Sequence, residues 1–302
     1  MKRRWLVALA AVFILVAAPV AALATFQSSL IYHPDREEVA PNFPETQAVR
    51  IATEDGESLV AWYRTPQEGQ PVFLFFDGNG GRPQIWGGRW RRIAETGAGF
   101  LAVYYRGYAG STGHPSERGL HLDARAGYDW LIDQGYEPRD IVIHGFSLGS
   151  GVATRLASEH PARALILEAP FTGVDDVVAD YLTPMAAVLV RESFRSRDWI
   201  GDVHMPVLIV HGDRDTVIPF AQGERLFEMA NEPKQFVRIP GSDHATLVRD
   251  GIYPHIAAFL AENPRSKKWP NRRPNRLKRL SPRFSRLWSR KAAAKMRRRS
   301  IS

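Results

Sequence analysis

Short apolar runs alternate along most of the chain with longer segments whose apolar residues recur at helical spacing. Short apolar runs bounded by turn residues are typical of strands buried on both faces, as in parallel sheets. The first two runs flank Asp55-Gly56 and predict an antiparallel hairpin. The pattern predicts an α/β fold with a mostly parallel, doubly wound sheet of eight strands. The expected strands are Val49–Thr53, Leu59–Arg64, Val72–Phe76, Phe100–Tyr104, Ile141–His144, Ala164–Glu168, Val207–Val210 and Gln235–Ile239.

The segment Ile141–Gly151 reads IVIHGFSLGSG and predicts a strand, a sharp turn and the start of a helix. Ser147 lies at the apex of that turn, between Gly145 and Gly149. A nucleophile elbow brings strand and helix so close together that side chains at the two glycine positions would clash. The similar stretch Gly110–Gly113 lacks the first glycine of the pattern, and we interpret it as a loop. The pattern indicates Ser147 as a nucleophile.

A serine hydroxyl becomes a good nucleophile when a histidine accepts its proton and a carboxylate fixes the imidazole tautomer. Asp213 and Asp215 both follow the run Val207–Val210, and we favour Asp215 as the acid because it lies deeper in the loop. Asp213 is expected to cap the loop instead. His244 directly follows the last predicted strand and is the candidate base, with a helix predicted behind it from Leu247 to Leu260.

The tetrahedral intermediate of acyl transfer needs backbone N–H donors aimed at its oxyanion. One donor should be the N–H of Leu148, directly after the nucleophile. The other should come from the loop Asp77–Gly81, which follows the strand Val72–Phe76, and we assign the N–H of Asn79. The alternative is a flexible glycine hairpin, which the helix-like segment Pro83–Thr96 behind the loop disfavours.

The other histidines show no comparable pattern, and cysteine is absent. His144 and His211 each precede a glycine at a strand end and are expected to pack or hydrogen-bond locally. The absence of cysteine excludes a disulfide framework, a thiolate nucleophile and a cysteine-based metal site. No metal and no organic cofactor is expected. The histidines without a convincing partner are His33, His114, His121, His160, His204 and His255.

These residues resemble the Bem46/ABHD13/ABHD17-like branch of the α/β-hydrolases, from about residue 28 to residue 260. The resemblance implies an α/β-hydrolase fold and a serine esterase, lipase or acyl-protein thioesterase. It also implies a catalytic triad of Ser147, Asp215 and His244 and an oxyanion hole of Asn79 and Leu148. The motifs that carry it are SLIYHP (Ser29–Pro34), FFDGNGG, YRGYAGSTGHPSERGLHLDA (Tyr105–Ala124), GFSLGSG, LEAPF (Leu167–Phe171), HGDRDTVIP and PGSDH.

One position departs from the family pattern. The family usually has histidine in the oxyanion loop where this chain has Asp77. An ionised carboxylate that pointed at the developing oxyanion would oppose catalysis. We therefore expect Asp77 to turn away and to accept hydrogen bonds from neighbouring loop amides. We expect the substitution to affect the catalytic rate and the range of substrates, and to leave the fold unchanged.

The net charge of +8 conceals two basic ends on an acidic body. Residues 265–302 carry sixteen Lys or Arg and no acid, and Lys2, Arg3 and Arg4 add three more. Residues 25–264 hold the remaining 21 basic residues and all 32 acidic residues, which gives this part a charge of −11. One hydrolase domain over residues 25–264 with two terminal appendages fits the length better than two domains.

The first appendage, residues 1–24, contains an uninterrupted apolar run from Trp5 to Ala24 behind a basic flank. Such a run is long enough to span a bilayer as a single helix. The basic flank should stay cytoplasmic, which puts the enzyme on the non-cytoplasmic side, the periplasm in a bacterium. Cleavage as a signal peptide before Thr25 is the alternative and would give a secreted protein. A buried core helix would leave the basic residues unexplained.

The second appendage, residues 265–302, is expected to be extended near Pro270 and Pro274 and could start a helix at Ser281-Pro282. An interfacial helix on anionic lipid and a solvated polycation fit this tail equally well. Nucleic-acid binding is not expected, because the positive charge of the tail is the sole feature that would support it. The apolar residues that would share one face of the helix are Phe284, Leu287, Trp288 and Met296.

The insertion at residues 171–204 is expected either to form a small apolar cap over an acyl pocket or to pack as an ordinary helix; its apolar residues are Tyr181, Leu182, Met185, Val188 and Leu189. The chain as a whole predicts a serine hydrolase of carboxylic esters or thioesters that forms an acyl-enzyme on Ser147. A membrane-tethered, non-catalytic adaptor that keeps the hydrolase fold is the alternative from another class. A lipid-surface binding module with incidental esterase activity is a third. The acyl length and the oligomeric state are left open.

Overall fold

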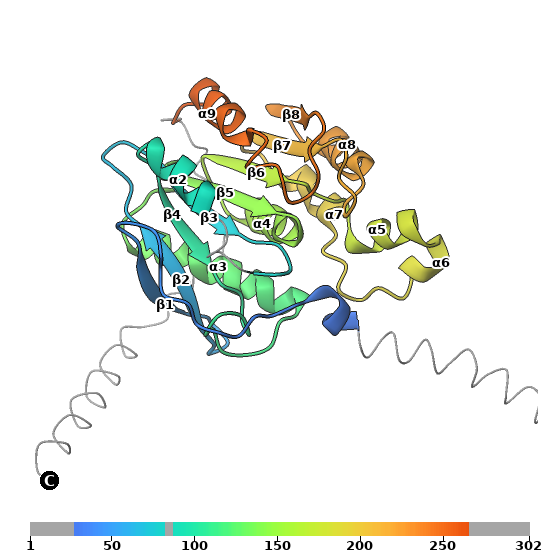
Figure 1. Cartoon of the computed structure of the whole chain (residues 1–302), viewed down its shortest axis with the longest axis horizontal. Helices are drawn as coiled ribbons and strands as arrows, with labels where there is room; N and C mark the ends of the chain where they lie inside the picture. The colour runs from blue at the N-terminus through green and yellow to red at the C-terminus, as the bar shows by residue number, and fades with distance from the viewer. Residues whose placement is uncertain (1–26, 82–86, 266–302) are drawn as a thin grey trace, which may run out of the picture. The chain divides into compact units, whose positions relative to one another are not determined.

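The computed structural model describes residues 27–81 and 87–265, which form a sheet of eight strands covered by helices on both faces (Figure 1). The strands lie in the order β1-β2-β4-β3-β5-β6-β7-β8. All eight predicted strands are confirmed, with ends that differ by at most two residues. Their bounds are β1 (Gln47–Ala52), β2 (Ser58–Arg64), β3 (Val72–Phe76), β4 (Gly99–Val103), β5 (Ile141–Phe146), β6 (Ala164–Glu168), β7 (Val207–Gly212) and β8 (Lys234–Ile239).

The sheet is antiparallel at one edge and parallel elsewhere. Strand β2 pairs antiparallel with β1, with Val49 opposite Ala61, and it also pairs antiparallel with β4, while every pairing from β4 through β8 is parallel. Every residue of β3 to β7 is buried. This complete burial explains why these strands read as continuous apolar runs in the sequence. The predicted doubly wound architecture and the hairpin at Asp55-Gly56 are confirmed.

Helices cover both faces of the sheet. Figure 1 shows α2 and α9 on one face, and α3, α4 and α8 on the other. Strands β5, β7 and β8 are parallel and lie close together in the sheet. The loops that follow their carboxyl ends therefore meet at the same end of the strands. The helices are α2 (Gly87–Glu95), α3 (Glu117–Asp133), α4 (Leu148–Glu159), α5 (Val174–Tyr181), α6 (Pro184–Ala187), α7 (Ser196–Trp199), α8 (Phe220–Met229) and α9 (Ile252–Glu262).

The structure corrects one helix boundary. The helix predicted from Leu247 begins only at Ile252, as α9, because Gly251 adopts φ 100° and this left-handed conformation cannot continue a helix. The helix predicted over residues 83–96 is confirmed as α2 from Gly87 onward, and its first residues lie outside the described part of the chain.

Apart from Arg265, the two terminal appendages lie outside the described residues. The predicted N-terminal span and the predicted interfacial helix of the basic tail therefore stay predictions. Among the residues that the structure does describe, no helix has both the length and the apolar composition needed to cross a membrane.

The insertion at residues 171–204 folds into the short helices α5, α6 and α7 beside the sheet. Four of the five apolar residues considered for the cap do not pack into the body. The side chains of Tyr181, Leu182, Met185 and Val188 are 53%, 70%, 78% and 78% exposed. The prediction of an ordinary packed helix at these positions is therefore wrong.

Candidate active site

Ser147 occupies a strained turn between β5 and α4. Its backbone has φ 51° and ψ −120°, a conformation that residues other than glycine rarely adopt. The flanking glycines are required by close packing. A Cβ atom at Gly145 would lie 2.3 Å from the carbonyl oxygen of Gly149, and one at Gly149 would lie 2.1 Å from the carbonyl oxygen of Phe76. The predicted nucleophile elbow is present, while the similar stretch at Gly110–Gly113 is a loop, as expected.

The structure brings Ser147, His244 and Asp215 together. The Ser147 Oγ lies 2.9 Å from Nε2 of His244, and Nδ1 of His244 lies 2.7 Å from Oδ2 of Asp215. In the tautomer that satisfies both contacts, Nδ1–H donates to the carboxylate and Nε2 accepts from the serine hydroxyl. The ring of Phe146 packs against the imidazole, with the two ring centroids 5.1 Å apart. This is the nucleophile–base–acid geometry that acyl transfer to a serine requires.

Hydrogen bonds within the loop after β7 fix the carboxylate of Asp215. Its Oδ1 accepts the N–H groups of Val217 at 2.9 Å and Ile218 at 2.8 Å. Burial alone would raise the pKa of Asp215, but hydrogen bonds with His211 and His244 hold that pKa far below its usual value. Asp215 is therefore ionised and can stabilise an imidazolium at His244.

Two neighbouring aspartates serve the loops rather than the imidazole. Asp213 accepts the N–H of Gly241 at 2.7 Å and pairs with Arg238 at 2.7 Å, which agrees with its predicted capping role. Asp243 was not singled out from the sequence. Its Oδ1 accepts the N–H of His244 at 2.8 Å and the N–H of Thr216 at 3.0 Å, so it joins the loop that carries the base to the loop that carries the acid.

Both candidate oxyanion donors belong to segments that adjoin the nucleophile. A Cβ atom at Gly78 would be 3.4 Å from the Cβ of Ser147, which places the loop Asp77–Gly81 directly against the elbow. The carbonyl of Asn79 accepts the hydroxyl of Tyr108 at 2.8 Å and the N–H of His33 at 3.3 Å, and these bonds anchor the loop. Within the described residues, no hydrogen bond occupies the N–H of Asn79 or of Leu148. Their role as oxyanion donors stays a prediction.

Asp77 accepts a hydrogen bond from a neighbouring loop amide, as expected, while the expectation that it turns away from the oxyanion stays a prediction. It is 3% exposed, and its Oδ1 accepts the N–H of Gly78 at 2.7 Å. Its carbonyl accepts the hydroxyl of Tyr105 at 2.9 Å. The carboxylate is thus engaged with a loop amide, which fixes the turn into the oxyanion loop.

A buried charged cluster beneath the elbow was missed by the sequence analysis. Arg89 on α2 donates to both oxygens of Glu168 at the end of β6, at 2.5 and 2.8 Å, and Nε2 of His144 on β5 lies 2.6 Å from the same carboxylate. The N–H of Ser147 donates to the carbonyl of Glu168 at 2.9 Å, so the cluster supports the nucleophile. The signals in the sequence were a glutamate that ends an apolar strand and a histidine inside another; nothing marked Arg89 as their partner.

The protonation states in this cluster follow from burial and charge. Burial would raise the pKa of Glu168, but Arg89 and His144 lower it to about 2. Burial lowers the pKa of His144 more than Glu168 raises it, so the ring is neutral and donates through Nε2–H. His211 also bonds locally, with Nε2 3.0 Å from the carbonyl of Ile218. The predicted local roles of His144 and His211 are confirmed.

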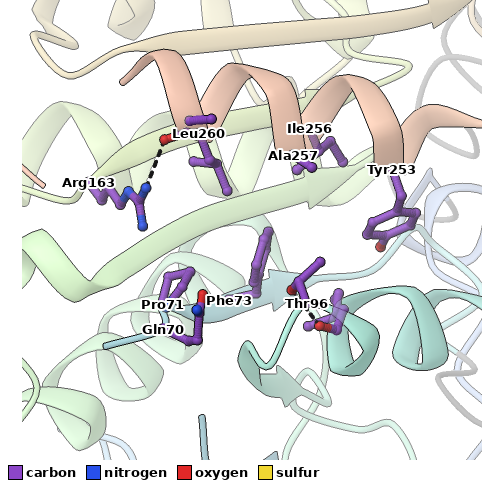
Figure 2. Close-up of a pocket in the computed structure, with 11 residues that line it drawn as sticks. Gln70, Pro71, Phe73, Thr96, Arg163, Tyr253, Ile256, Ala257 and Leu260 are labelled. Atoms are coloured by element: carbon purple, nitrogen blue, oxygen red, sulfur yellow. Dashed lines mark hydrogen bonds between the residues drawn. The ribbon is translucent and has the colours of Figure 1, made fainter. Parts of the chain in front are cut away.

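A cavity of about 230 Å³ lies between α2 and α9, and Figure 2 shows its lining side chains. None of the five sequence-predicted site residues lines it. Tyr253 stands at its edge, and the hydroxyl of this tyrosine accepts from Arg89 at 3.2 Å. The cavity therefore borders the buried cluster and is separate from the serine and its partners. Over residues 27–81 and 87–265, no group of three or more His, Asp or Glu side chains is arranged to hold a metal ion.

Comparison with known proteins finds relatives in bacteria and eukaryotes, although no family model matches the chain. An uncharacterized protein of Mycobacterium tuberculosis is 36% identical over 226 residues, which cover 72% of this chain and 80% of that protein. Protein bem46 of Schizosaccharomyces pombe is 30% identical over 236 residues, which cover 72% of this chain and 78% of bem46. The lysophosphatidylserine lipase ABHD12 of Danio rerio is 33% identical over 201 residues, which cover 57% of this chain and 51% of ABHD12.

Solved structures show the same fold at low sequence identity. An esterase of Pyrococcus furiosus superposes with a TM-score of 0.62 at 20% identity, covering 77% of this chain and 98% of that one. An α/β-hydrolase of Vibrio vulnificus superposes with a TM-score of 0.61 at 24% identity, covering 73% and 82% of the two chains.

Proposed function

The chain belongs to the α/β-hydrolase family of bem46 and ABHD12, and from this premise we propose that it is a serine hydrolase that cleaves carboxylic esters or thioesters through an acyl-enzyme on Ser147. The observation that carries the proposal is the continuous relay from the Ser147 hydroxyl through His244 to Asp215, with contacts of 2.9 and 2.7 Å.

Each group has a defined task in this mechanism. His244 Nε2 accepts the proton of the Ser147 hydroxyl as its oxygen attacks the acyl carbon, while ionised Asp215 stabilises the imidazolium. The N–H groups of Asn79 and Leu148 stabilise the oxyanion of the tetrahedral intermediate. The imidazolium then protonates the departing alkoxide or thiolate, which leaves an acyl ester on Ser147. Water, deprotonated by the same His244, hydrolyses that ester and restores the serine.

The site and its surroundings support this proposed substrate class. The relay supplies the nucleophile and the base that an acyl ester or thioester needs, and the N–H groups of Asn79 and Leu148 would supply the oxyanion donors. Apolar side chains are exposed on α5 and α6. They lie close to the loop that carries Asp215, since the Tyr181 hydroxyl donates to the carbonyl of Thr216 at 2.8 Å. An apolar acyl group fits these surroundings, and ABHD12 is named for a lysophospholipid substrate.

The proposed location is the non-cytoplasmic side of a membrane. Residues 1–24 would hold the protein there as a single N-terminal helix, and a protein secreted after cleavage before Thr25 is the alternative. The tail at residues 265–302 would add electrostatic attraction to anionic lipid.

Turnover tests the proposal directly. The full chain should hydrolyse a chain-length series of p-nitrophenyl esters and acyl-coenzyme A thioesters, with a preferred length in at least one series. Ser147→Ala and His244→Ala should each lower kcat by at least about 10³-fold, since both residues act in one unit. A folded wild-type chain without turnover on either series would contradict the proposal and favour a non-catalytic adaptor with the hydrolase fold.

A further inference from the structure

Half of the exposed large apolar side chains of the described residues lie in one short segment of the insertion. Eight large apolar residues in this part of the chain are strongly exposed, and four of them lie in the short span from Tyr181 to Val188. We call Tyr181, Leu182, Met185 and Val188 the cap face. A folded soluble surface rarely concentrates large apolar side chains in this way unless the patch contacts a partner or a membrane.

Two further exposed residues adjoin the cap face. The hydrogen bond from Tyr181 to Thr216 places Val217, which is 52% exposed, next to it. Leu30 is 64% exposed and belongs to the helical turn at residues 27–31. That turn is joined to the other end of the cap, because the side-chain oxygen of Gln27 accepts the N–H of Arg191 at 2.7 Å.

The remaining two exposed residues do not belong to the cap face. Met229 ends α8 and Ile132 lies at the end of α3, and both helices lead into the amino ends of strands. The cap face borders the carboxyl ends, where the loops that carry Asp215 and His244 meet. The apolar surface is thus specific to the side of the candidate active site.

The cap face is also free of unpaired negative charge, although the body as a whole is acidic. No Asp or Glu occurs between Tyr181 and Val190, and Arg191 follows directly. The flanking acids have partners: Asp180 pairs with Arg225 at 2.6 Å, and Glu192 accepts the hydroxyl of Tyr32 at 2.7 Å. A surface of this kind can enter the headgroup region of a bilayer without burying a lone carboxylate.

The position of the apolar run before the first described residue indicates that the partner of the cap face is a lipid bilayer. The apolar run that is long enough to span a bilayer ends at Ala24, and Gln27 is bonded to the end of the cap. The three residues from Thr25 to Gln27 can extend at most about 11 Å. A span that ends at Ala24 therefore brings the cap face to the level of the lipid headgroups. Figure 1 shows the described chain starting beside the α5–α6 region, which projects from the body.

We propose that the cap face docks on the lipid bilayer and that the candidate active site opens toward the membrane. Leu182, Met185 and Val188 would insert among the headgroups. The docking does not require turnover. Its consequence rests on the proposed function: an acyl chain would pass from the bilayer along the cap face to Ser147 without crossing water.

Site-specific labelling tests the docking without reference to activity. The chain has no cysteine, so a single introduced cysteine takes one label. Met185→Cys and Met229→Cys form a matched pair, because both methionines are exposed, at 78% and 47%, and only Met185 belongs to the cap face. Each full-length variant would carry the fluorophore NBD and be reconstituted in phosphatidylcholine–phosphatidylglycerol vesicles. Lipids brominated near the headgroup should quench the label at 185 and leave the label at 229 unchanged.

Two results would overturn the docking. A label at 185 that is as water-exposed and as little quenched as the label at 229 shows that the cap face stays in water. The label at 185 could instead be shielded from water in detergent without lipid, to an extent that rises with protein concentration. That result would assign the cap face to a second copy of the chain.

A kinetic arm tests the consequence for substrate entry. Met185→Ser with Val188→Ser should lower hydrolysis of a long-chain ester dissolved in the bilayer by several-fold and leave hydrolysis of a water-soluble short ester unchanged. The control Met229→Ser should change neither rate. Equal loss on both substrates contradicts membrane entry. Quenching at 185 in a protein without turnover would keep the docking and reject only the hydrolase function.

Discussion

At the scale of single residues, two neighbouring aspartates in the loop after β7 have different burial and different partners. Asp213 and Asp215 are two positions apart, yet Asp213 pairs with Arg238 at the surface while Asp215 is buried against His244 and His211. The sequence ranked the two correctly from their depth in the loop. It did not indicate Asp243, whose role depends on two loops that meet only in the folded protein.

Asp215→Asn should lower kcat by about 10⁴-fold, because a neutral amide neither stabilises the imidazolium nor fixes the reactive tautomer of His244. Asp213→Asn is the matched control and should keep kcat near that of the wild type. The measurement is steady-state hydrolysis of a water-soluble short ester. Equal loss in the two variants would contradict the assignment of Asp215 as the acid.

At the scale of elements, the fold was predictable where local pattern and tertiary environment agree. The strands β3 to β7 are buried on both faces, so their apolar runs identified them. The start of α9 was placed too early, because the apolar periodicity continues backward through Leu247 while the backbone turns at Gly251. The Arg89–Glu168–His144 cluster could not be predicted, since it joins α2, β6 and β5 and exists only once the strand order is known.

Gly149→Ala should disrupt the junction of β5 and α4, because its Cβ would overlap the carbonyl oxygen of Phe76. We expect a loss of about 1–3 kcal/mol in the free energy of unfolding, together with loss of hydrolysis. Gly80→Ala in the neighbouring loop is the control, since a Cβ there meets no atom of the described residues within 4 Å. Urea unfolding of both variants measures the difference. An equally stable and active Gly149→Ala would refute the close approach at the elbow.

Glu168→Gln should destabilise the protein by about 3–5 kcal/mol at neutral pH, because it removes the carboxylate charge that pairs with the buried Arg89 guanidinium. The pKa of Glu168 is lowered to about 2 from an ordinary value of 4.5, so its stabilisation is fully present above the ordinary value and is lost as the pH falls toward 2. The free energy of unfolding should thus converge between variant and wild type as the pH falls through this window. A difference that does not change with pH would contradict an ionised Glu168.

At the scale of the whole molecule, charge and apolar surface are unevenly distributed. Residues 25–264 carry a charge of −11, and residues 265–302 carry sixteen basic residues and no acid. The exposed apolar residues gather at the cap face, beside the loops of the candidate site. The charge asymmetry was readable from composition, whereas the cap face required the structure, because apolar spacing alone did not distinguish a packed helix from an exposed one.

The basic tail should bind anionic lipid. Residues 25–302 should sediment with phosphatidylglycerol-containing vesicles at low salt and much less at high salt, since each Lys or Arg near such a surface contributes about 1 kcal/mol before screening. A chain that ends at Pro264 should lose this salt-dependent component. Equal binding by the two chains would contradict the role of the tail.

The central claim is that His244 and Asp215 activate Ser147 for acyl transfer. The most direct test is labelling of the full chain with a fluorophosphonate probe, followed by mass spectrometry of the modified peptide. We predict a single adduct on Ser147 that is absent from Ser147→Ala and strongly reduced in His244→Ala. A folded wild-type protein that takes no label, or takes it on another residue, would contradict the claim.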